Sequence, residues 1–511
     1  MNRILLLLRE RPGVVMAALL IGWGIVSIGW GERLLRADGF GWDGTAYRDM
    51  TQLWPNEMPK LSVYTGHRCL PSLVVHYSLK ALGRPLDGPD VLMAFSIYNL
   101  LLYVLILYLL LACADALGLD TKGKWLLFGG FFLNYVHLKQ HYYSACVTDV
   151  WALAASAFAL LAYLKRWTLC VALGTIAGSF AWPAMLPLTI GFLVFPRRSG
   201  AATEPTPAPY GLNVWAAGAL ALLVVGGAYY LVFVELYYGV IPTEVVKSAL
   251  AISLVCLAAF LYHFFRPLFD FGALYDWRTY IDWRAAVGCV LVVATVKITK
   301  EIFHPIEHLF PSPYLPLTPL DFIRRILVTS VAKPLLFGVG HVVWYGPVIL
   351  IAAFLWKEVC ALAQRVGVGL VVALAAGGLM GINPESRASQ AYFPIVALLT
   401  AWALQDRIAY RGQWVILLVY AILMSHVWLP LNRKPWPEAD LIYDFPMQRF
   451  FMHFGGYMIN KTYLILGGTC IYAGVVLWFT VFRPEPFARG TRWVFAKCSP
   501  RSKPTEAGAP A

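Results

Sequence analysis

Asp43 is the first residue of the chain whose surroundings indicate chemistry. A carboxylate can accept the proton of a reacting hydroxyl group, and cationic side chains bind anions such as phosphate. The alternative interpretation is that Asp43 only caps the start of a helix. Titratable neighbours in the same polar stretch favour a site: Asp38, Asp49, His67 and Arg68.

A second polar stretch begins with His137 and His141 and ends at Thr148-Asp149. The two histidines have the spacing of a metal-binding pair on one helix face, but no third ligand accompanies them. The sequence therefore names no metal ligand, and it leaves a divalent metal ion open as a cofactor. Asp149 is either a site residue or a carboxylate that stabilises the start of a helix.

A third polar stretch reads Asn383-Pro384-Glu385-Ser386-Arg387 and is followed by Tyr392-Phe393-Pro394. An ordinary turn with an acidic residue near the first turn of a helix would have the same residue types. This stretch alone does not distinguish the two interpretations.

The rest of the sequence indicates a membrane protein. Of its 511 residues 59% are hydrophobic and 14% are charged, whereas soluble domains are about 45–50% apolar and about 25% charged. Many of the aromatic residues lie beside apolar runs, as they do at membrane interfaces. A water-soluble core cannot accommodate this excess of apolar residues.

Charge and cysteine content exclude other classes. The formal net charge of +13 is scattered between apolar segments and forms no basic stripe, so nucleic acid is not an expected partner. The nine cysteines show no metal-ligand spacing. Only Cys69 and Cys146 are expected on an oxidising side, and the sequence leaves open whether they pair.

The predicted fold is all-α, a polytopic transmembrane bundle of thirteen or fourteen spans. Each span needs about 20 mostly apolar residues. The apolar runs lie at 14–30, 91–112, 125–136, 150–164, 169–180, 184–195, 212–234, 246–265, 285–296, 337–356, 366–382, 391–404, 414–429 and 463–482. The count is fourteen if the segment around Phe180, Trp182 and Pro183 is the tip of a hairpin of two short helices.

Loop charges favour fourteen spans with both termini on the cytoplasmic side. Short inner loops should carry the excess of Lys and Arg, and with fourteen spans they contain the basic pairs: Lys122/Lys124, Lys165/Arg166, Arg197/Arg198, Lys357/Arg365 and Arg407/Arg411. The short outer loops then carry single basic residues. Because no cleavage site follows Trp30, the first span is expected to be retained.

We expect one transmembrane domain, residues 1–482, and a basic, partly disordered cytoplasmic tail, residues 483–511. The large outer stretches are 31–90, 301–334 and 431–461, and two turns, 137–149 and 383–391, lie on the same side. In the first stretch, Asp43 is predicted to start one short interfacial helix. A second runs from Leu70 to Leu82, with Leu73, Val74, Tyr77 and Ala81 at helical spacing along the membrane surface.

Together these features resemble the GT-C superfamily of polytopic membrane glycosyltransferases. The shared pattern is an acidic residue in a large first outer loop, Thr148-Asp149 at the outer start of the fourth span, and Glu385-Ser386-Arg387 before an aromatic-Pro helix. The paired short helices around residues 178–187 are also similar to that architecture. The pattern covers roughly the first 200 residues and the region 383–394.

The resemblance implies that a sugar moves, with inversion, from a polyprenyl-phosphate carrier to an acceptor on the periplasmic face. Asp43 would be the general base and Asp149 would orient the acceptor or a metal. Glu385 would hold Arg387 in place. Basic residues would stabilise the departing phosphate: Arg68, Lys139, His141, Arg324, Arg325 and Arg387.

Further substrate contacts are expected from Arg48, His67 and the rings of Trp42, Tyr47 and Tyr142, which could stack on sugar faces or anchor the interface. The expected partners are a polyprenyl-phosphate-linked sugar, membrane lipids, and a glycan, lipid or protein acceptor. The simplest location is a bacterial inner membrane. The sequence leaves open the sugar, the acceptor and the carrier length.

Two other classes remain open. A multi-span transporter or flippase for lipid-linked saccharides usually has related halves and ionisable groups near mid-bilayer; we find no matched halves, and Lys297 lies near a helix end. A scaffold subunit would give Asp43 no chemical role.

Overall fold

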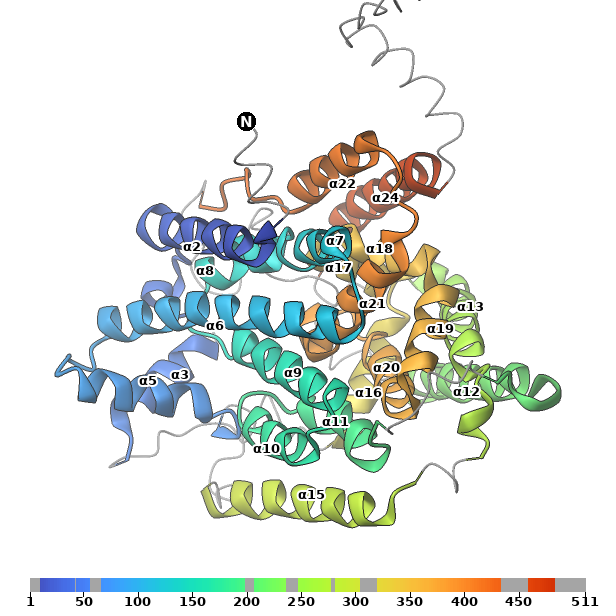
Figure 1. Cartoon of the computed structure of the whole chain (residues 1–511), viewed down its shortest axis with the longest axis horizontal. Coiled ribbons are helices and arrows are strands. Elements are labelled where there is room, and N and C mark those ends of the chain that lie inside the picture. Colours follow the sequence, from blue (N-terminus) through green and yellow to red (C-terminus); the bar gives the residue numbers. More distant parts are fainter. Residues whose placement is uncertain are drawn as a thin grey trace, which may run out of the picture.

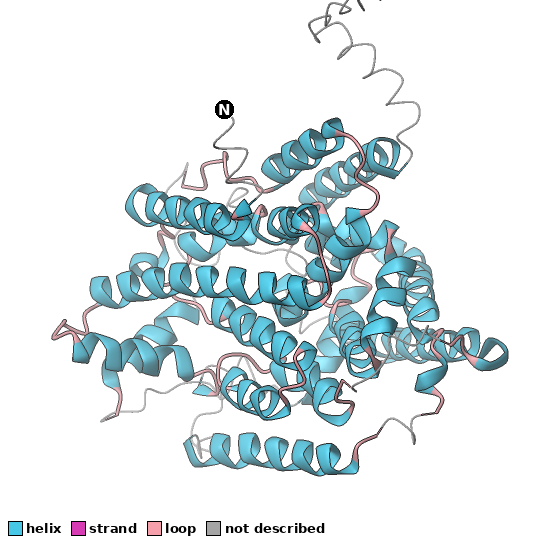
Figure 2. Ribbon diagram, in the orientation of Figure 1, coloured by secondary structure: helices cyan, strands magenta, loops and turns pink. Residues whose placement is uncertain are grey.

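The computed structural model describes residues 10–41, 43–55, 66–197, 206–235, 247–276, 281–303, 319–432 and 458–482. Within these ranges the fold contains twenty α-helices and no strand, with short 3-10 and π segments between helices (Figures 1 and 2). The all-α prediction is confirmed.

The α-helices, in chain order, are α2 (Pro12–Trp30), α3 (Asp43–Leu53), α5 (Leu70–Ala81), α6 (Gly88–Ala116), α7 (Thr121–Phe132), α8 (His141–Tyr143), α9 (Asp149–Leu164), α10 (Thr168–Ser179), α11 (Met185–Val194), α12 (Leu212–Tyr229), α13 (Leu250–Phe269), α15 (Trp283–Phe303), α16 (Pro319–Ser330), α17 (Leu336–Tyr345), α18 (Val348–Phe354), α19 (Trp356–Val366), α20 (Val368–Met380), α21 (Phe393–Gln405), α22 (Arg411–Met424) and α24 (Asn460–Leu477). Three shorter segments matter below: η1 (Arg36–Gly39), η2 (Val136–Gln140) and η8 (Ser386–Tyr392).

Five helical segments in the described ranges are long and apolar enough to cross a membrane: 12–30, 88–116, 209–234, 250–269 and 460–482. Each coincides with a predicted span. By the length and composition of these helices, the chain is an integral membrane protein. The full number of crossings, and the side on which the termini lie, remain predictions.

The predicted hairpin is present as α10 and α11, which pack against each other and leave Phe180–Ala184 as the tip. At 1.5 Å per residue, their 12 and 10 residues span about 18 and 15 Å. Both lengths are short of a hydrocarbon core of about 30 Å. The backbone N–H of Leu70 donates to the carbonyl of Phe180 at 3.2 Å. The tip therefore lies next to the first large polar stretch.

Two boundaries differ from the sequence prediction. The expected single span at 337–356 is divided into α17 and α18 at Gly346-Pro347, because Pro347 has no N–H to donate and Gly346 has a φ of 75°. The residues between Lys357 and Arg365, expected as an inner loop, form α19. This helix buries Val359, Cys360 and Ala363 at helical spacing and keeps its charged residues on the other side.

The two short helices of the first outer stretch are confirmed, and they pack together. Ser72 Oγ in α5 donates to the carbonyl of Tyr47 in α3 at 3.0 Å, and His76 Nδ1 donates to the carbonyl of Thr51 at 2.6 Å. The predicted apolar stripe lies on the more exposed face of α5, where Tyr77 is 56% exposed. This pairing fixes the direction of α3, which begins at Asp43.

Contacts between the outer stretches bring them to one end of the molecule. Glu32, just after α2, accepts the backbone N–H groups of Leu431 and Asn432 at 2.8 and 2.9 Å. Lys139 Nζ lies 3.1 Å from Glu32 Oε2. Lys333 donates to the carbonyl of Met458, which ties the second large stretch to the third.

Residues of the predicted inner loops also contact one another. Arg407 pairs with Glu358 at 2.6 Å, and Lys122 donates to the carbonyl of Ile408 at 3.2 Å. These contacts join segments that the fourteen-span topology places on one side, and the contacts around Glu32 join segments that it places on the other. The sides on which these loops lie remain a prediction.

Glu32 is expected to be a main anchor of the first outer stretch. Replacing it by Ala should lower the free energy of unfolding by about 1–3 kcal/mol, because two backbone N–H groups lose a charged acceptor. Glu358→Ala, which breaks an ion pair with 44% and 42% exposed side chains, should cost no more than about 1 kcal/mol. Denaturation of the purified full chain, followed by circular dichroism, measures both.

The effect of Glu32 should also depend on pH. Burial raises the pKa of Glu32, but hydrogen bonds from Leu431, Asn432 and Lys139 outweigh burial and lower it below 4.5. Its contribution is then complete above the unfolded-state pKa and is lost as the pH falls through the folded-state pKa. The difference between wild type and Glu32→Ala should shrink at acidic pH; a difference that grows there would contradict this assignment.

Candidate active site

Arg387 joins two carboxylates that are far away in the sequence. Its Nε lies 2.9 Å from Oδ1 of Asp149, and its Nη2 lies 3.0 Å from Oδ2 of the same residue. The same Nη2 lies 3.4 Å from Oδ2 of Asp43. The Asp149 contact is bidentate, the geometry in which a guanidinium binds a carboxylate most specifically. One residue from each of the three polar stretches therefore meets at a single centre.

Helix starts position both carboxylates. Asp43 is the first residue of α3 and Asp149 is the first residue of α9, where the helix dipole favours negative charge. The interpretations as a helix-starting acid and as a site residue are therefore compatible. Arg387 lies in η8, which packs against α9 and α20, and Ser156 Oγ in α9 donates to the carbonyl of Ala391 at the end of η8.

Burial distinguishes the two carboxylates. The Asp149 side chain is 2% exposed, whereas those of Asp43 and Arg387 are 31% and 25% exposed. Burial alone lowers the pKa of Arg387, but the charges of Asp149 and Asp43 outweigh it and raise that pKa well above the ordinary value. The guanidinium therefore stays protonated, with Asp149 as its buried counter-ion and Asp43 as the more accessible carboxylate.

Trp182, at the tip between α10 and α11, was not among the predicted site residues. The guanidinium carbon of Arg68 lies 4.0 Å from the centre of its ring, and that of Arg387 lies 6.0 Å from it. Arg68 is 2% exposed, and its positive charge acts on Asp149. The only sequence signal was an aromatic-Pro pair at a hairpin tip, which also fits an interface anchor.

Lys300 was also missed. It lies near the end of α15, and its Nζ is 5.8 Å from the centre of the Phe180 ring, at the same hairpin tip. In sequence it resembles any lysine that ends an apolar run, as does Lys297.

Several predicted substrate contacts have other roles in the structure. Arg48 pairs with Asp49 at 2.7 Å, and Lys139 pairs with Glu32. Tyr47 is fully buried in the apolar cluster that contains Phe40 and Val75, so its ring cannot stack on a sugar without moving. Each of these residue types was compatible with binding, but the fold uses them in packing or in ion pairs.

Histidine and tyrosine side chains of the second stretch are also internal. Tyr142 is 4% exposed and packs against Tyr103, whose hydroxyl is hydrogen-bonded to Nδ1 of His141. Burial lowers the pKa of His141 to about 4, although the charge of Asp149 acts in the opposite direction. His141 is therefore neutral at pH 7 and does not supply the positive charge predicted for it. His137 Nδ1 donates to the carbonyl of Phe131.

Glu385 does not hold Arg387 as the sequence suggested. It is exposed and acts on Arg387 only through its charge, while the ion pairs of Arg387 are made by Asp43 and Asp149. Adjacency in sequence was a poor guide here because the backbone of Glu385 is extended, with a ψ of 95°.

Of the remaining predicted residues, the structure describes His67, Arg324 and Arg325. His67 is half-buried just before α5. Arg324 lies 4.0 Å from Asp321 on α16, which also carries Arg325. Trp42 lies outside the described residues.

Cys69 and Cys146, whose pairing the sequence left open, are both free thiols, and Cys146 donates to the carbonyl of Gly44 at 3.4 Å. Among the described residues, no three His, Cys, Asp or Glu side chains are grouped so that they could hold a metal ion. The question of a metal stays open.

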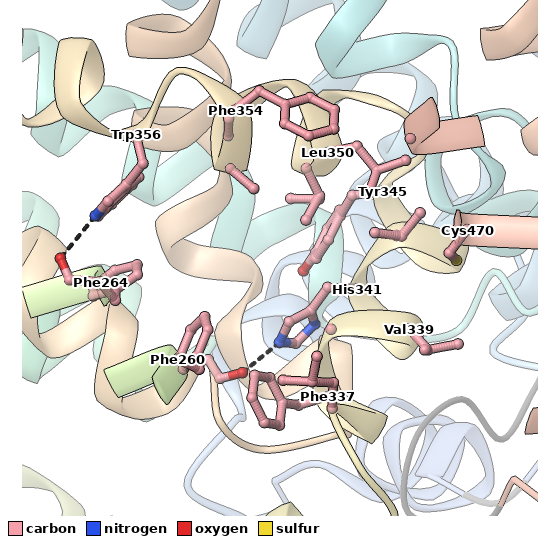
Figure 3. A pocket seen from close by; sticks show the side chains of 18 of the residues that line it. Phe260, Phe264, Phe337, Val339, His341, Tyr345, Leu350, Phe354, Trp356 and Cys470 are labelled. Carbon is pink, nitrogen blue, oxygen red and sulfur yellow. Dashed lines mark hydrogen bonds between the residues drawn. The ribbon is translucent and has the colours of Figure 1, made fainter. Parts of the chain in front are cut away.

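An apolar cavity of about 1020 Å³ lies beside this centre (Figure 3). Its walls come from α13, α17, α18, α20, α21 and α24, and almost all of its surface is apolar. Residues between Tyr463 and Phe479 of the apolar segment 460–482 line it, and this stretch of helix is about 24 Å long. At the end near Arg387 it is lined by Tyr345, Ser389 and Tyr392.

The sequence did not predict this cavity. Glycines form part of its wall, among them Gly377 on α20, which packs against the ring of Tyr392, and Gly467 on α24, where an added Cβ would have only Val339 within 4 Å. In sequence these residues look like ordinary small residues of membrane helices.

No family model matches the sequence, and no curated protein matches it. Among solved structures, the chain is similar to the archaeal oligosaccharyltransferase AglB from Archaeoglobus fulgidus, in complex with an inhibitory peptide and a dolichol-phosphate, with 12% sequence identity and a TM-score of 0.39. The match covers 98% of this chain and 62% of AglB, so the chain spans less than two-thirds of the length of AglB.

The superfamily resemblance drawn from the sequence therefore gains no support from this likeness. At this identity and TM-score it assigns no role to any residue.

Asp149 is expected to stabilise the fold more than Asp43 does. Asp149→Asn replaces the charged partner of a largely buried guanidinium by a neutral amide, and it should lower the free energy of unfolding by about 2–4 kcal/mol. This is at or below the usual range for a fully buried pair, because Arg387 is 25% exposed. Asp43→Asn should cost no more than about 1 kcal/mol. Chemical denaturation of the purified chain measures both.

The double variant Asp149→Asn/Arg387→Gln serves as the control. It should be more stable than the sum of the two single changes predicts, since it removes both charges together. Equal losses for Asp43→Asn and Asp149→Asn, or strict additivity, would contradict a central ion pair between Arg387 and Asp149.

Proposed function

We propose that this chain is a membrane glycosyltransferase that takes a sugar from a polyprenyl-phosphate carrier. The observation that carries the proposal is that η8 belongs both to the Asp43–Arg387–Asp149 centre and to the wall of a long apolar cavity: Arg387 is part of the centre, and Ser389 and Tyr392 line the cavity. A ligand that fits both parts has a long hydrocarbon chain and an anionic head. A sugar-bearing isoprenoid phosphate has this chemistry.

The cavity has the size and lining that an isoprenoid chain requires. Its volume of about 1020 Å³ is at the upper end for small-molecule sites, which are commonly about 300–1,000 Å³. Aromatic rings line it along its length, among them Phe260, Phe337 and Trp356 (Figure 3). Unsaturated hydrocarbon packs well against such surfaces, whereas a polar substrate would lose its hydration without gaining hydrogen bonds.

Arg387 is the proposed phosphate-binding residue. Its contacts with Asp43 and Asp149 use Nε and Nη2, so Nη1 can donate to a phosphate oxygen without breaking the pair with Asp149. Arg68, whose guanidinium carbon lies 4.0 Å from the centre of the Trp182 ring, adds positive potential from a buried position. Both cations stabilise the negative charge that develops on the leaving phosphate.

Asp43 is the proposed general base. In the proposed step an acceptor hydroxyl oxygen attacks the anomeric carbon, the bond from that carbon to the phosphate oxygen breaks, and the phosphate leaves with the bonding electrons. Asp43 takes the acceptor's proton, so that atoms and charge balance. Attack opposite to the leaving phosphate inverts the anomeric centre.

Asp149 has a different role in this proposal. Since it is buried and bidentate with Arg387, it orients the guanidinium rather than the acceptor. The acceptor, a glycan, a lipid or a protein, would approach from the exposed side of Asp43. The predicted periplasmic face and bacterial inner membrane are part of the same proposal.

Asp43→Asn is expected to reduce sugar transfer by about 100-fold or more, because it removes the proton acceptor and keeps the shape of the side chain. Transfer of labelled sugar from a panel of polyprenyl-phosphate donors, in membranes containing the full chain, measures this. Asp90→Asn is a matched control, since Asp90 also lies in the first turn of a helix and pairs with an arginine, Arg84, at 2.7 Å. It should retain wild-type transfer.

Retained transfer in Asp43→Asn would remove Asp43 as the base. If no donor is consumed while a lipid-linked saccharide crosses the bilayer, the chain is a transporter instead.

Filling the cavity should weaken carrier binding. Gly467 lines the cavity, and an added Cβ would lie 3.8 Å from Val339, so Gly467→Leu fits without a backbone clash. It should raise the KM for the carrier about tenfold or more, since the side chain takes space that the isoprenoid needs. Gly468→Leu is the control, because Gly468 has no atom within 4 Å of an added Cβ and does not line the cavity. Equal KM values for the two variants would place the carrier elsewhere.

A further inference from the structure

α17 connects the wall of the apolar cavity to the backbone that carries Arg387. His341 and Tyr345 both line the cavity (Figure 3). Both also make hydrogen bonds to Ser386, the residue before Arg387. The side chains that would touch a bound chain are therefore the same ones that hold the proposed phosphate-binding residue.

His341 fixes the turn that precedes η8. The carbonyl of Gly381 can only accept, so His341 Nε2 donates to it at 2.7 Å and Nδ1 accepts from Ser386 Oγ at 2.9 Å. A single neutral imidazole therefore joins the end of α20 to the start of η8. The distance between Gly381 and Ser386 is thereby fixed from the cavity side.

Tyr345 fixes the same residue through the backbone. Its hydroxyl donates to the carbonyl of Ser386 at 2.8 Å. Its ring stacks on Phe393, with the centroids 4.2 Å apart and the planes 17° apart. Because Phe393 begins α21 directly after η8, Tyr345 contacts both ends of the segment that contains Arg387, and Ser389 Oγ adds a second hydrogen bond to the Ser386 carbonyl at 3.1 Å.

These contacts matter because the centre tolerates little displacement. Arg387 must reach two oxygens of Asp149 at 2.9 and 3.0 Å while its Nη2 stays 3.4 Å from Asp43. A shift of Ser386 moves the Cα of Arg387 with it, and bidentate pairs lose energy steeply when their geometry is lost.

We propose that Tyr345 and His341 are positioning residues that couple the filling of the apolar cavity to the placement of Arg387, so that the phosphate of an isoprenoid phosphate is bound well only when its chain is in place. The inference rests on the proposed function, since it assumes that the cavity takes the carrier's chain. A chain packed against His341 excludes water from its partly buried hydrogen bond to Ser386, which strengthens that bond in the low-dielectric surroundings. A chain packed against the ring of Tyr345 keeps the buried hydrogen bond from its hydroxyl to Ser386 in place. Recognition of the head is then conditional on recognition of the chain.

The test compares two probes, farnesyl phosphate and farnesol, by equilibrium binding to the purified full chain in lipid nanodiscs. Wild type should bind farnesyl phosphate at least about tenfold more tightly than farnesol, because only the phosphate reaches Arg387. Tyr345→Phe removes the hydroxyl and keeps the ring that lines the cavity. It should leave farnesol binding unchanged and reduce the preference for the phosphate to about threefold or less.

Tyr392→Phe is the matched control. Tyr392 lines the same end of the cavity, and within the described residues its buried hydroxyl has no hydrogen-bond partner, so removing that hydroxyl should keep the wild-type preference. Ser386→Ala is a second variant, which removes the hydrogen bond to His341 and should reduce the preference in the same direction.

The outcomes separate this inference from the function on which it rests. A Tyr345→Phe chain that keeps the full preference, or one that loses affinity for both probes together with its thermal stability, overturns the coupling and leaves the carrier site in place. Wild type that binds both probes equally also overturns the coupling. Wild type that binds neither probe overturns the carrier site itself and the coupling with it.

Discussion

The ion pair between Arg387 and Asp149 is the constraint on which the rest of this end of the molecule depends. A carboxylate as buried as that of Asp149, 2% exposed, is tolerated only with a well-aligned counter-ion, and Arg387 makes two hydrogen bonds to it. To form the pair, η8 must lie against the start of α9, and α3 must then bring Asp43 to the remaining side. Arg387 is thereby in contact with Asp149, 238 residues away in the sequence, and with Asp43, 344 residues away.

The membrane explains why this charge lies where it does. Apolar helices leave only their connecting loops for ionisable groups, and the topology brings alternate loops to the same end. In the proposed function, the centre and the apolar cavity that η8 also lines form one site, with an ion-paired region for the head and an apolar region for the hydrocarbon chain. Soluble substrates need the first part and membrane lipids need the second; a lipid-linked sugar needs both. α17 joins the two parts through Ser386, and this connection is the physical basis for treating them as one site.

Much of this arrangement could be predicted from the sequence, and the failures have common causes. Apolar periodicity located the helices, and loop charge placed Asp43, Asp149 and Arg387 on one side, because both signals are local and repeat along the chain. The partner of Arg387 was misassigned to Glu385, since only tertiary packing decides which carboxylate it reaches. His141 was expected to be charged, but its burial depends on α6 and could not be seen locally. The cavity was missed for a similar reason: it is a volume left between helices, and no sequence pattern marks it.

The measurement that tests this account most directly is a cryo-EM structure of the full chain in lipid nanodiscs with a polyprenyl phosphate. The account predicts hydrocarbon density in the cavity along α17 and α24, with the phosphate within hydrogen-bond distance of Arg387 and with Asp43 still open to an acceptor. A phosphate bound at the opposite end of the cavity, near Trp356, or a chain bound on the outer surface of the helices, would contradict it.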